Sequence, residues 1–261
     1  ISINEARDQV GGDEVVIEGT VSRAFGAYAR IQDSSGPAGA SGILLRQADG
    51  GLANPFQSDI EDGTIQRGTT LRVSGIVSEF NNLVQINGGD LTGYEVIRQG
   101  PPPVPISVTA GEVNSSAPDD NYESVLVSIA GLNFPSASPG EFQNSTSYTV
   151  EDTAGDQVSF RVQFPDETEL GGTPIPVDAF EYEGVVGVFR EERQLIPVRE
   201  SDIRTDTDGF VTTWATSEAA ESIFIPTAPG TDYDFTINWG DGTVERISGT
   251  DPNPEHTYAG A

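Results

Sequence analysis

The stretch EVVIEGTVSR at residues 14–23 indicates the fold class, because apolar and polar residues alternate along it after an apolar start. That alternation is typical of a β-strand with one buried face. Further short stretches rich in β-branched residues follow it, each bounded by Gly, Asn, Asp or Pro. They are YARIQD at 28–33, GILLRQ at 42–47, TLRVSGIVSEF at 70–80 and LVQIN at 83–87. Only residues 3–10 read as a short helix, with Ser2 or Asn4 as its cap.

The same order of strands returns in the second part of the chain. Gly131 lies 112 positions after Gly19 (131 − 19), and Gly184 lies 109 positions after Gly75 (184 − 75). The stretch ISVTAGEVNS, which opens the second copy, also aligns with ISINEARDQV, which opens the first. The second set of strands is SVLVSIAGLN at 124–133, YTVED at 148–152, VSFRVQF at 158–164, AFEYEGVVGVF at 179–189 and QLIPV at 194–198. Residues 1–98 and 106–205 are therefore predicted to be two copies of one β domain.

The recurring glycines predict how each sheet is shaped. Gly19, Gly75, Gly131 and Gly184 lie inside predicted strands, where Gly marks a bulge or a tight bend. A five-stranded sheet that bends in its first and fourth strands curls into a small Greek-key barrel. Between the two copies, QGPPPVP at 99–105 is a proline-rich linker that favours a stiff, extended spacer.

A third β segment is predicted over residues 208–261. Its alternating stretches are FVTTWAT at 210–216, SIFIP at 222–226, YDFTINW at 233–239 and a return strand at 244–247. The Gly-Asp-Gly at 240–242 is a hairpin turn signal. The fold class is therefore all-β, with two similar domains followed by a third.

The composition excludes several kinds of chemistry. Among 261 residues there is no Cys, and His256 is the single histidine. A disulfide scaffold, a Cys-ligated metal and a cysteine nucleophile are impossible, and a triad would have to be built around His256. The chain carries 41 acidic residues against 13 basic ones, all Arg, for a net charge of −28. That field repels polyanions, so we do not expect nucleic-acid binding. No apolar run is long enough to span a membrane.

The acidity leaves three interpretations open. A salt-rich, halophilic habitat favours carboxylates with Arg in place of Lys, because high salt screens their repulsion to within roughly 3 Å at 1 M. A soluble, acidic exported protein and calcium binding by clustered Asp are the other two. The chain has no starting Met and no signal peptide. We therefore expect an extracellular or cell-surface protein after removal of a signal sequence, or a trimmed piece of one.

Residues 1–205 resemble the OB-fold repeats of exported bacterial proteins, which often lie beside nuclease or surface-anchoring domains. The helical opening ISINEAR, the strand EVVIEGTVSRAFG and the pair IQDSSG and VEDTAG carry this resemblance. It implies two tandem OB-like five-stranded Greek-key barrels, and it says little about function.

Residues 208–261 resemble a PKD-like, Ig-like bacterial surface-repeat β-sandwich. FVTTW, SIFIPT, YDFTINWGDGTVE and HTY carry this resemblance, and such domains are typically non-catalytic modules of surface proteins. The family pattern continues after HTY with further strands, so the sandwich is incomplete here. Either the protein continues past Ala261, or a strand from another molecule completes the sheet, which would let copies build an open filament.

Two sets of residues are candidates for binding. Asp232, Asp234 and Asp241, with Glu245 near them, are calcium candidates because Ca²⁺ takes several oxygen ligands. The alternative is that Asp241 turns the hairpin through backbone amides while the other carboxylates are solvated. No other cofactor is expected. The ligand-binding candidates are Arg23, Phe25, Tyr28 and Arg30, on the face that OB-folds use for single strands.

Three further residues are expected to be structural. Asp33 and Asp152 occupy the same place in both copies, each followed by a small residue and Gly, and are predicted to be turn residues rather than a catalytic pair. His256 lies in the HTY motif and is expected to pack.

These features predict a non-catalytic, structural or adhesive surface protein, with a filament subunit assembled by strand complementation as one form of it. Its partners would be copies of itself or other surface proteins. The alternatives are an accessory region of a larger secreted nuclease or hydrolase that binds nucleic acid or glycan, and a glycan-binding module. The last would use exposed aromatic residues such as Tyr28, Tyr94 and Tyr182.

Overall fold

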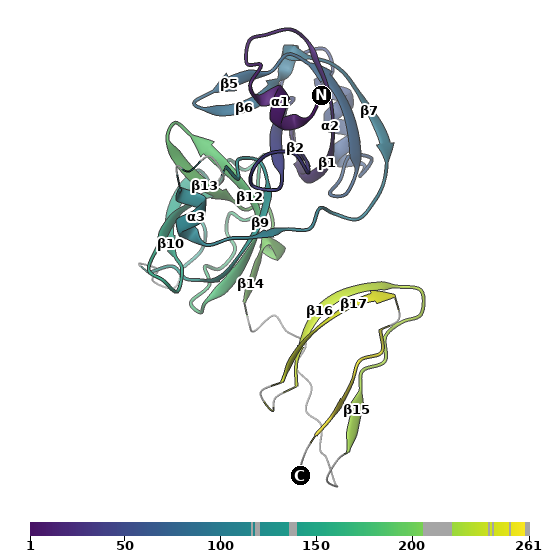
Figure 1. Cartoon of the computed structure of the whole chain (residues 1–261). Helices are drawn as coiled ribbons and strands as arrows, with labels where there is room; N and C mark the ends of the chain where they lie inside the picture. The colour runs from purple at the N-terminus through teal and green to yellow at the C-terminus, as the bar shows by residue number, and fades with distance from the viewer. Residues whose placement is uncertain are drawn as a thin grey trace. The chain divides into compact units, whose positions relative to one another are not determined.

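The computed structural model describes residues 1–115, 117, 121–135, 140–205, 221–239, 241, 243–250 and 252–258. Strands predominate among them, so the predicted all-β fold class is confirmed (Figure 1). The chain divides into two compact units, Ile1–Gly209 and Phe210–Ala261. The first unit contains two halves, which we call the first half (residues 1–98) and the second half (residues 106–205). None of the described helices is long and apolar enough to cross a bilayer.

The first half is one twisted sheet with two helices. The strands pair in the order β5-β6-β3-β2-β1-β4-β7, and all pairs are antiparallel except β3 with β6. Its elements are α1 (Ile3–Arg7), β1 (Val15–Phe25), β2 (Tyr28–Asp33), β3 (Ser41–Arg46), α2 (Ala53–Glu61), β4 (Thr70–Gly75), β5 (Ser78–Phe80), β6 (Leu83–Asn87), a 3₁₀ turn η1 (Gly88–Asp90) and β7 (Leu91–Arg98).

The second half repeats part of this pairing. β12 pairs antiparallel with β9, as β4 does with β1, and with β13, as β5 does with β6. β11 pairs parallel with β13, as β3 does with β6. The sheet order is β10-β11-β13-β12-β9-β8, with β14 beside β12. Its elements are β8 (Ile106–Ser107), α3 (Ala110–Asn114), β9 (Leu126–Leu132), β10 (Thr146–Glu151), β11 (Gln157–Val162), β12 (Phe180–Phe189), β13 (Glu192–Ile196), a 3₁₀ turn η3 (Glu200–Asp202) and β14 (Ile203–Thr205).

The number of strands differs from the prediction. The expected strand at 70–80 is divided into β4 and β5, because the chain bends after Gly75 and buries Val77 in the core. β7, β8 and β14 also extend the sheets beyond five strands. Among the described residues the pairings form open paths and no closed barrel, so the five-stranded OB-like barrel layout stays a prediction.

Each half has its own hydrophobic core. The first core is mostly aliphatic, with Ile17, Ile31 and Leu45 on its strands and Phe56 of α2 covering them. The second is rich in aromatic residues that stack or meet edge to face: Phe134, Phe142, Tyr148, Phe160, Phe180 and Tyr182.

The repeated openings form the same local structure. α1 is capped by Ser2, whose hydroxyl accepts a hydrogen bond from the Glu5 N–H, while the Glu5 side chain accepts one from the Ser2 N–H. Thr109 and Glu112 form the same capping box at α3. Such reciprocal pairs satisfy N–H groups that a helix start leaves unpaired.

The aspartate at the end of the second strand of each copy holds its own turn to that helix. Asp33 accepts a hydrogen bond from Ser35 N (2.9 Å) and one from Ile3 N at α1 (2.8 Å). Asp152 accepts one from Ala154 N (2.9 Å) and one from Ala110 N at α3 (3.1 Å). The turn role predicted for both residues is confirmed.

The second unit consists, in its described part, of two short antiparallel ladders. β15 (Ser222–Phe224) pairs with β18 (Glu255–Thr257), and β16 (Asp232–Asn238) pairs with β17 (Val244–Thr250). Its buried core is small: Ile237, Trp239 and Ile247. The strand predicted at 210–216 and the two glycines of the predicted hairpin turn lie outside the described residues, and the PKD-like layout stays a prediction.

Candidate binding cleft

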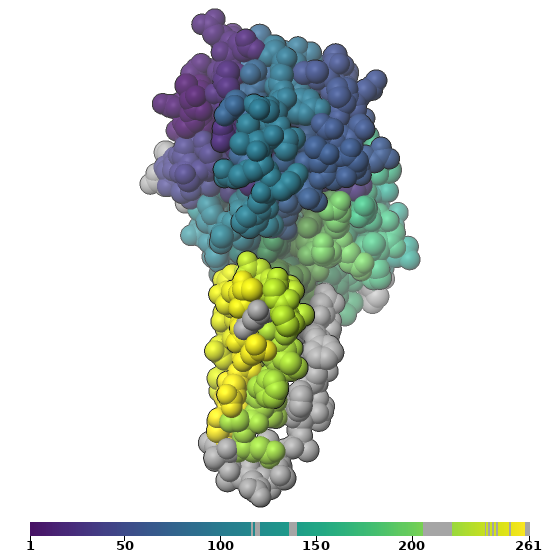
Figure 2. Space-filling model, turned by 90° about the vertical axis from the view of Figure 1, so that its right-hand side faces the viewer, coloured from purple at the N-terminus to yellow at the C-terminus, as the bar shows by residue number. Residues whose placement is uncertain are grey.

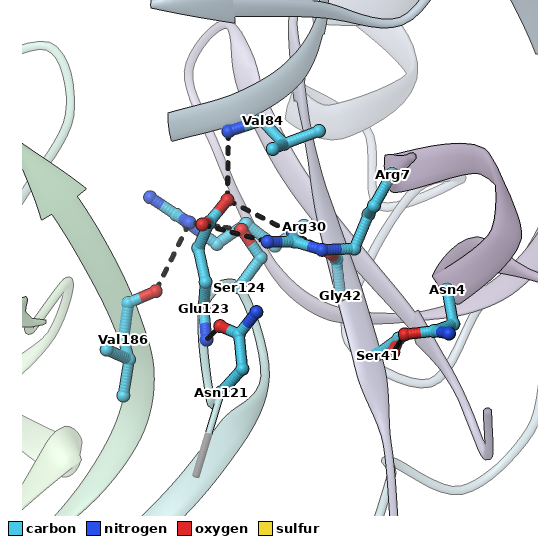
Figure 3. A network of polar contacts seen from close by, with 10 residues as sticks. All are labelled: Asn4, Arg7, Arg30, Ser41, Gly42, Val84, Asn121, Glu123, Ser124 and Val186. Carbon is cyan, nitrogen blue, oxygen red and sulfur yellow. Dashed lines mark hydrogen bonds and ion pairs between the residues drawn. The ribbon is translucent and has the colours of Figure 1, made fainter. Parts of the chain in front are cut away.

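A buried ion pair joins the two halves of the first unit. The Arg7 guanidinium at the end of α1 donates to both carboxylate oxygens of Glu123, at 3.1 and 2.9 Å, and also to the Gly42 carbonyl (Figure 3). Glu123 is only 4% exposed and also accepts a hydrogen bond from Val84 N (2.9 Å). Each oxygen of this buried carboxylate therefore has donors from the first half, which offsets the cost of burying it.

Two further contacts between the halves involve the backbone. The Leu126 N–H of β9 donates to the side-chain oxygen of Gln32 on β2 (2.8 Å). A Cβ atom on Gly42 would overlap the backbone carbonyl of Ser124, so only glycine fits at that point of β3. The two halves form one continuous surface in the space-filling view, the first in purple and blue and the second in teal to green (Figure 2).

A cleft of about 750 Å³ opens beside this contact. The first half contributes Arg23, Phe25 and Arg67 to its lining, and the second half contributes Glu183, Arg199 and Asp202. Three of the 13 arginines of the chain therefore line one cavity.

Arg23 is the most buried of these arginines. Its side chain lies on β1, is 8% exposed and donates one hydrogen bond, from a terminal nitrogen to the Glu167 carbonyl (2.7 Å). Its Nε has no partner among the described groups. No described carboxylate lies within ion-pair distance of it.

Arg30 lies directly opposite Arg23 in the β1–β2 ladder. It is 4% exposed and donates to the Ser124 hydroxyl (2.6 Å) and the Val186 carbonyl (3.4 Å) of the second half. Burial, with Arg23 beside it, lowers the pKa of Arg30 to about 10. Arg30 is thus still charged at neutral pH, and its Nε also has no described partner.

Two of the carboxylates that line the cleft are paired with arginines. Glu183 pairs with Arg67 and with Arg204 (2.7 Å), and Glu169 pairs with Arg199 (3.4 Å). Asp202 accepts hydrogen bonds from Val198 N and Arg199 N (2.7 and 3.1 Å). Burial raises the pKa of Asp202 and of Glu167, whose backbone carbonyl accepts the hydrogen bond from Arg23. These carboxylates position loops and arginines, and Arg23 is left without a close counter-ion.

The four ligand-binding candidates from the sequence lie at or near this cleft. Arg23 and Phe25 line it, and the Arg199 guanidinium lies 5.8 Å from the Phe25 ring centre. Tyr28 is half-buried, and burial, with Glu167 close by, raises its pKa. Arg30 is buried in the contact between the halves, so it does not lie on an open face as the single-strand hypothesis requires.

The proposed aromatic glycan face is only partly exposed. Tyr182 is fully buried, donates from its hydroxyl to the Val185 carbonyl (2.9 Å) and accepts from Ile196 N (3.0 Å). Tyr94 is partly buried and donates to Asp59 (2.7 Å). The expectation that Tyr182 is exposed was therefore wrong, because its ring fills the aromatic core of the second half.

The calcium candidates already have partners. Asp234 accepts two hydrogen bonds from Arg246 (3.0 and 2.8 Å), and Asp232 accepts one from the Thr250 hydroxyl (3.0 Å). Asp241 accepts one from Thr243 N (2.9 Å), as the turn interpretation predicts. Within the described ranges no group of three or more His, Asp or Glu side chains is placed to hold a metal, so a calcium site stays a prediction.

His256 packs as expected. Its ring stacks on Trp239 with 5.0 Å between ring centres and meets Tyr258 edge to face at 4.7 Å. Its Nε2 lies 2.8 Å from an Asp241 carboxylate oxygen. This hydrogen bond lowers the pKa of Asp241 to about 2.

The sequence did not single out Arg67, Glu123 or Ser124. Arg67 lies in a predicted loop, and Glu123 precedes a strand, so neither has a local pattern that marks it. Their roles depend on which faces of the two halves meet. No protein-family model matches this chain, and no curated protein matches it.

Proposed function

We propose that the chain is a non-catalytic adhesive module of an extracellular surface protein that holds its ligand in the cleft between its two halves. The observation that carries the proposal is Arg23, which lines the cleft, is 92% buried (100 − 8) and has no described ion-pair partner. A buried charge without a close counter-ion is costly, and such groups are usually kept for binding.

The contact between the halves supports a binding role and not a role in which the halves move against each other. The bidentate Arg7–Glu123 pair and the close approach of Gly42 to Ser124 hold the two lining surfaces in one arrangement. A preformed cleft loses little ordering entropy when it binds a ligand. Adhesion under load also benefits from such a fixed site.

The test is retention of the full chain on immobilised polysaccharides, with agarose that carries isolated galacturonate groups as the acidic probe and cellulose as the neutral one, because the net charge of −28 repels a polyanion. Ser201→Trp would fill the cleft from an exposed position of the 3₁₀ turn η3, and we expect it to reduce retention at least tenfold. Ser107→Trp, at the exposed position of β8 and outside the cleft lining, is the matched control and should behave as the parent. Equal retention of both variants would reject the cleft as the binding site.

A second candidate function is assembly into filaments by strand addition at the second unit. The described strands of this unit form only two-stranded ladders with one small buried cluster, and such ladders are marginally stable by themselves. Phe224 on β15 is also exposed. Light scattering and negative-stain microscopy across protein and salt concentration test this candidate, and monomers throughout would reject it.

A further inference from the structure

Two neighbouring arginines of the first half are buried without a close counter-ion. Arg23 and Arg30 face each other across the β1–β2 ladder and are 8% and 4% exposed. Like charges directly opposite in a ladder repel each other. The Nε atoms of both are without a partner among the described groups, and arginine stays protonated in proteins. In a chain with 41 acidic residues, this arrangement needs its own explanation.

The nearest carboxylates do not supply that counter-charge. Glu167 and Asp202 act on Arg23 from beyond ion-pair distance, and Asp202 already accepts two backbone hydrogen bonds. Glu123 also acts on Arg30, but its carboxylate is already bonded to Arg7 and Val84. The positive charge at this point is therefore not balanced by the described part of the protein.

We infer that the cleft between the halves binds an oxyanion group against the Arg23 guanidinium, with the buried Arg30 behind it and Arg67 beside it. Arg23 uses only one of its five N–H donors in the described contacts. Arg67 also keeps an unpartnered Nε while a terminal nitrogen holds Glu183. Guanidinium groups bind carboxylate, sulfate and phosphate oxygens in a charge-assisted way. This inference names the ligand chemistry of the proposed binding function and rests on it.

The surroundings favour a small or isolated anionic group over a polyanion. Glu61 and Asp62 are exposed and lie at the edge of the cleft. Together with the net charge of −28 they repel a long chain of phosphates. A single carboxylate or sulfate that enters the cleft meets arginines instead. The same chemistry occurs in a free oxyanion and in one acidic sugar residue of a saccharide.

The experiment follows the arginine Nε–H signals of the ¹⁵N-labelled full chain by NMR. With 13 arginines these signals are few enough to assign. Sulfate, acetate and a galacturonate trisaccharide are titrated separately at constant ionic strength with chloride as the balancing anion. We expect the Arg23 signal to shift saturably with at least one of these probes. Binding of the trisaccharide at least tenfold tighter than acetate would identify a saccharide as the source, and similar binding would identify a free oxyanion.

Variants that fold as the parent does distinguish a loss of binding from a loss of folding. Arg67→Gln lies in a half-buried loop position and should weaken binding at least fivefold while the arginine spectrum otherwise stays that of the parent. Arg72→Gln removes an exposed arginine of β4, outside the cleft lining, and should leave binding unchanged. Because Arg30 lies opposite Arg23 in the ladder, its signal should also shift when an anion binds, and Arg23→Gln should abolish that shift.

Linear, unsaturated shifts of Arg23 with all three probes would overturn the inference, and so would equal binding by the Arg67→Gln variant and the parent. The polysaccharide columns report on the proposed function separately. Retention that is lost in Ser201→Trp, combined with no oxyanion binding, would leave the cleft as a site for neutral ligands and reject only the inference about its chemistry.

Discussion

Gly42 shows how one residue determines the contact between the two halves. Its backbone lies against the carbonyl of Ser124, and its own φ is not in the left-handed region. Alanine is therefore compatible with the backbone conformation, and only the space for a Cβ is missing. The effect of a substitution here is a steric one across the contact.

We predict that Gly42→Ala destabilises the protein by about 1–3 kcal/mol, the usual cost of overpacking a tight contact. Denaturant unfolding followed by circular dichroism measures it. Gly93→Ala on β7 is the matched control, because a Cβ there meets nothing within 4 Å. Its stability should stay at the parent value or rise by about 0.5–1 kcal/mol. Equal effects of the two changes would contradict the close approach.

The Arg7–Glu123 pair gives a second prediction for single residues. Glu123→Gln leaves the mostly buried Arg7 charge without its carboxylate, so we expect a loss of about 3–5 kcal/mol in unfolding free energy. Glu95→Gln, at the exposed pair with Arg72, should cost less than about 1 kcal/mol. Denaturant unfolding of both variants checks this prediction. Similar losses of unfolding free energy would show that the Arg7–Glu123 pair stabilises the protein no more than an exposed pair does.

Asp241 predicts how the second unit responds to acid. Its pKa of about 2 lies below the ordinary 3.8 because of the hydrogen bond to His256. A carboxyl group whose pKa is lowered by folding stabilises the fold fully above its unfolded pKa and loses this contribution as the pH falls. The loss should thus occur between about pH 4 and pH 2. Near-UV circular dichroism from pH 6 to pH 1.5 should show it, and Asp241→Asn should show a flatter profile over that range.

At the scale of elements, the repeated helix openings show how much the sequence can predict. The Ser2 cap and the turn aspartates have local signals and were predicted, although the first helix ends at Arg7 and not at residue 10. The capping box at Thr109 was not predicted, although its residues also lie three positions apart. α2 was missed because its N-cap is Leu52, whose side chain makes no cap hydrogen bond. The split between β4 and β5 was also missed, because it depends on the burial of Val77 in a core that other strands build.

The cleft was less predictable than the strands. Alternation predicted strands in the segments that carry Arg23 and Arg30, but it places side chains only on one face or the other. Which face meets the second half depends on contacts such as Gln32 with Leu126, 94 positions apart in the chain. No pattern within one strand contains that information.

We predict that Asp152→Ala destabilises the protein by about 1–3 kcal/mol, because it leaves the buried Ala110 N–H at the start of α3 without its acceptor. Asp178→Ala, at an exposed position, is the control and should change stability by less than about 0.5 kcal/mol. Thermal unfolding compares the two. If Asp152→Ala behaved like the control, the turn would not hold the helix.

At the scale of the whole molecule, the charge of −28 acts on every part of the surface. Self-repulsion destabilises a compact, highly charged chain, and salt screens it: the Debye length falls from about 10 Å at 0.1 M to about 3 Å at 1 M. We therefore predict that 1 M NaCl raises the unfolding temperature by at least several degrees relative to 0.1 M. Calorimetry measures this, and an unchanged or lower temperature would show that repulsion is unimportant.

The contact between the halves joins two different faces of one repeated fold. The first half uses Arg30 and Gln32 on β2 and Gly42 on β3, whereas the second half uses the start of β9 and Val186 of β12. The second half's counterparts of β2 and β3 are β10 and β11, where a hollow of about 380 Å³ lies instead of another half. Because such a heterologous contact is not self-complementary, repeating it would add each new half head to tail, in a ring or an open filament. The unit of two halves is therefore directional, because its two ends present different faces.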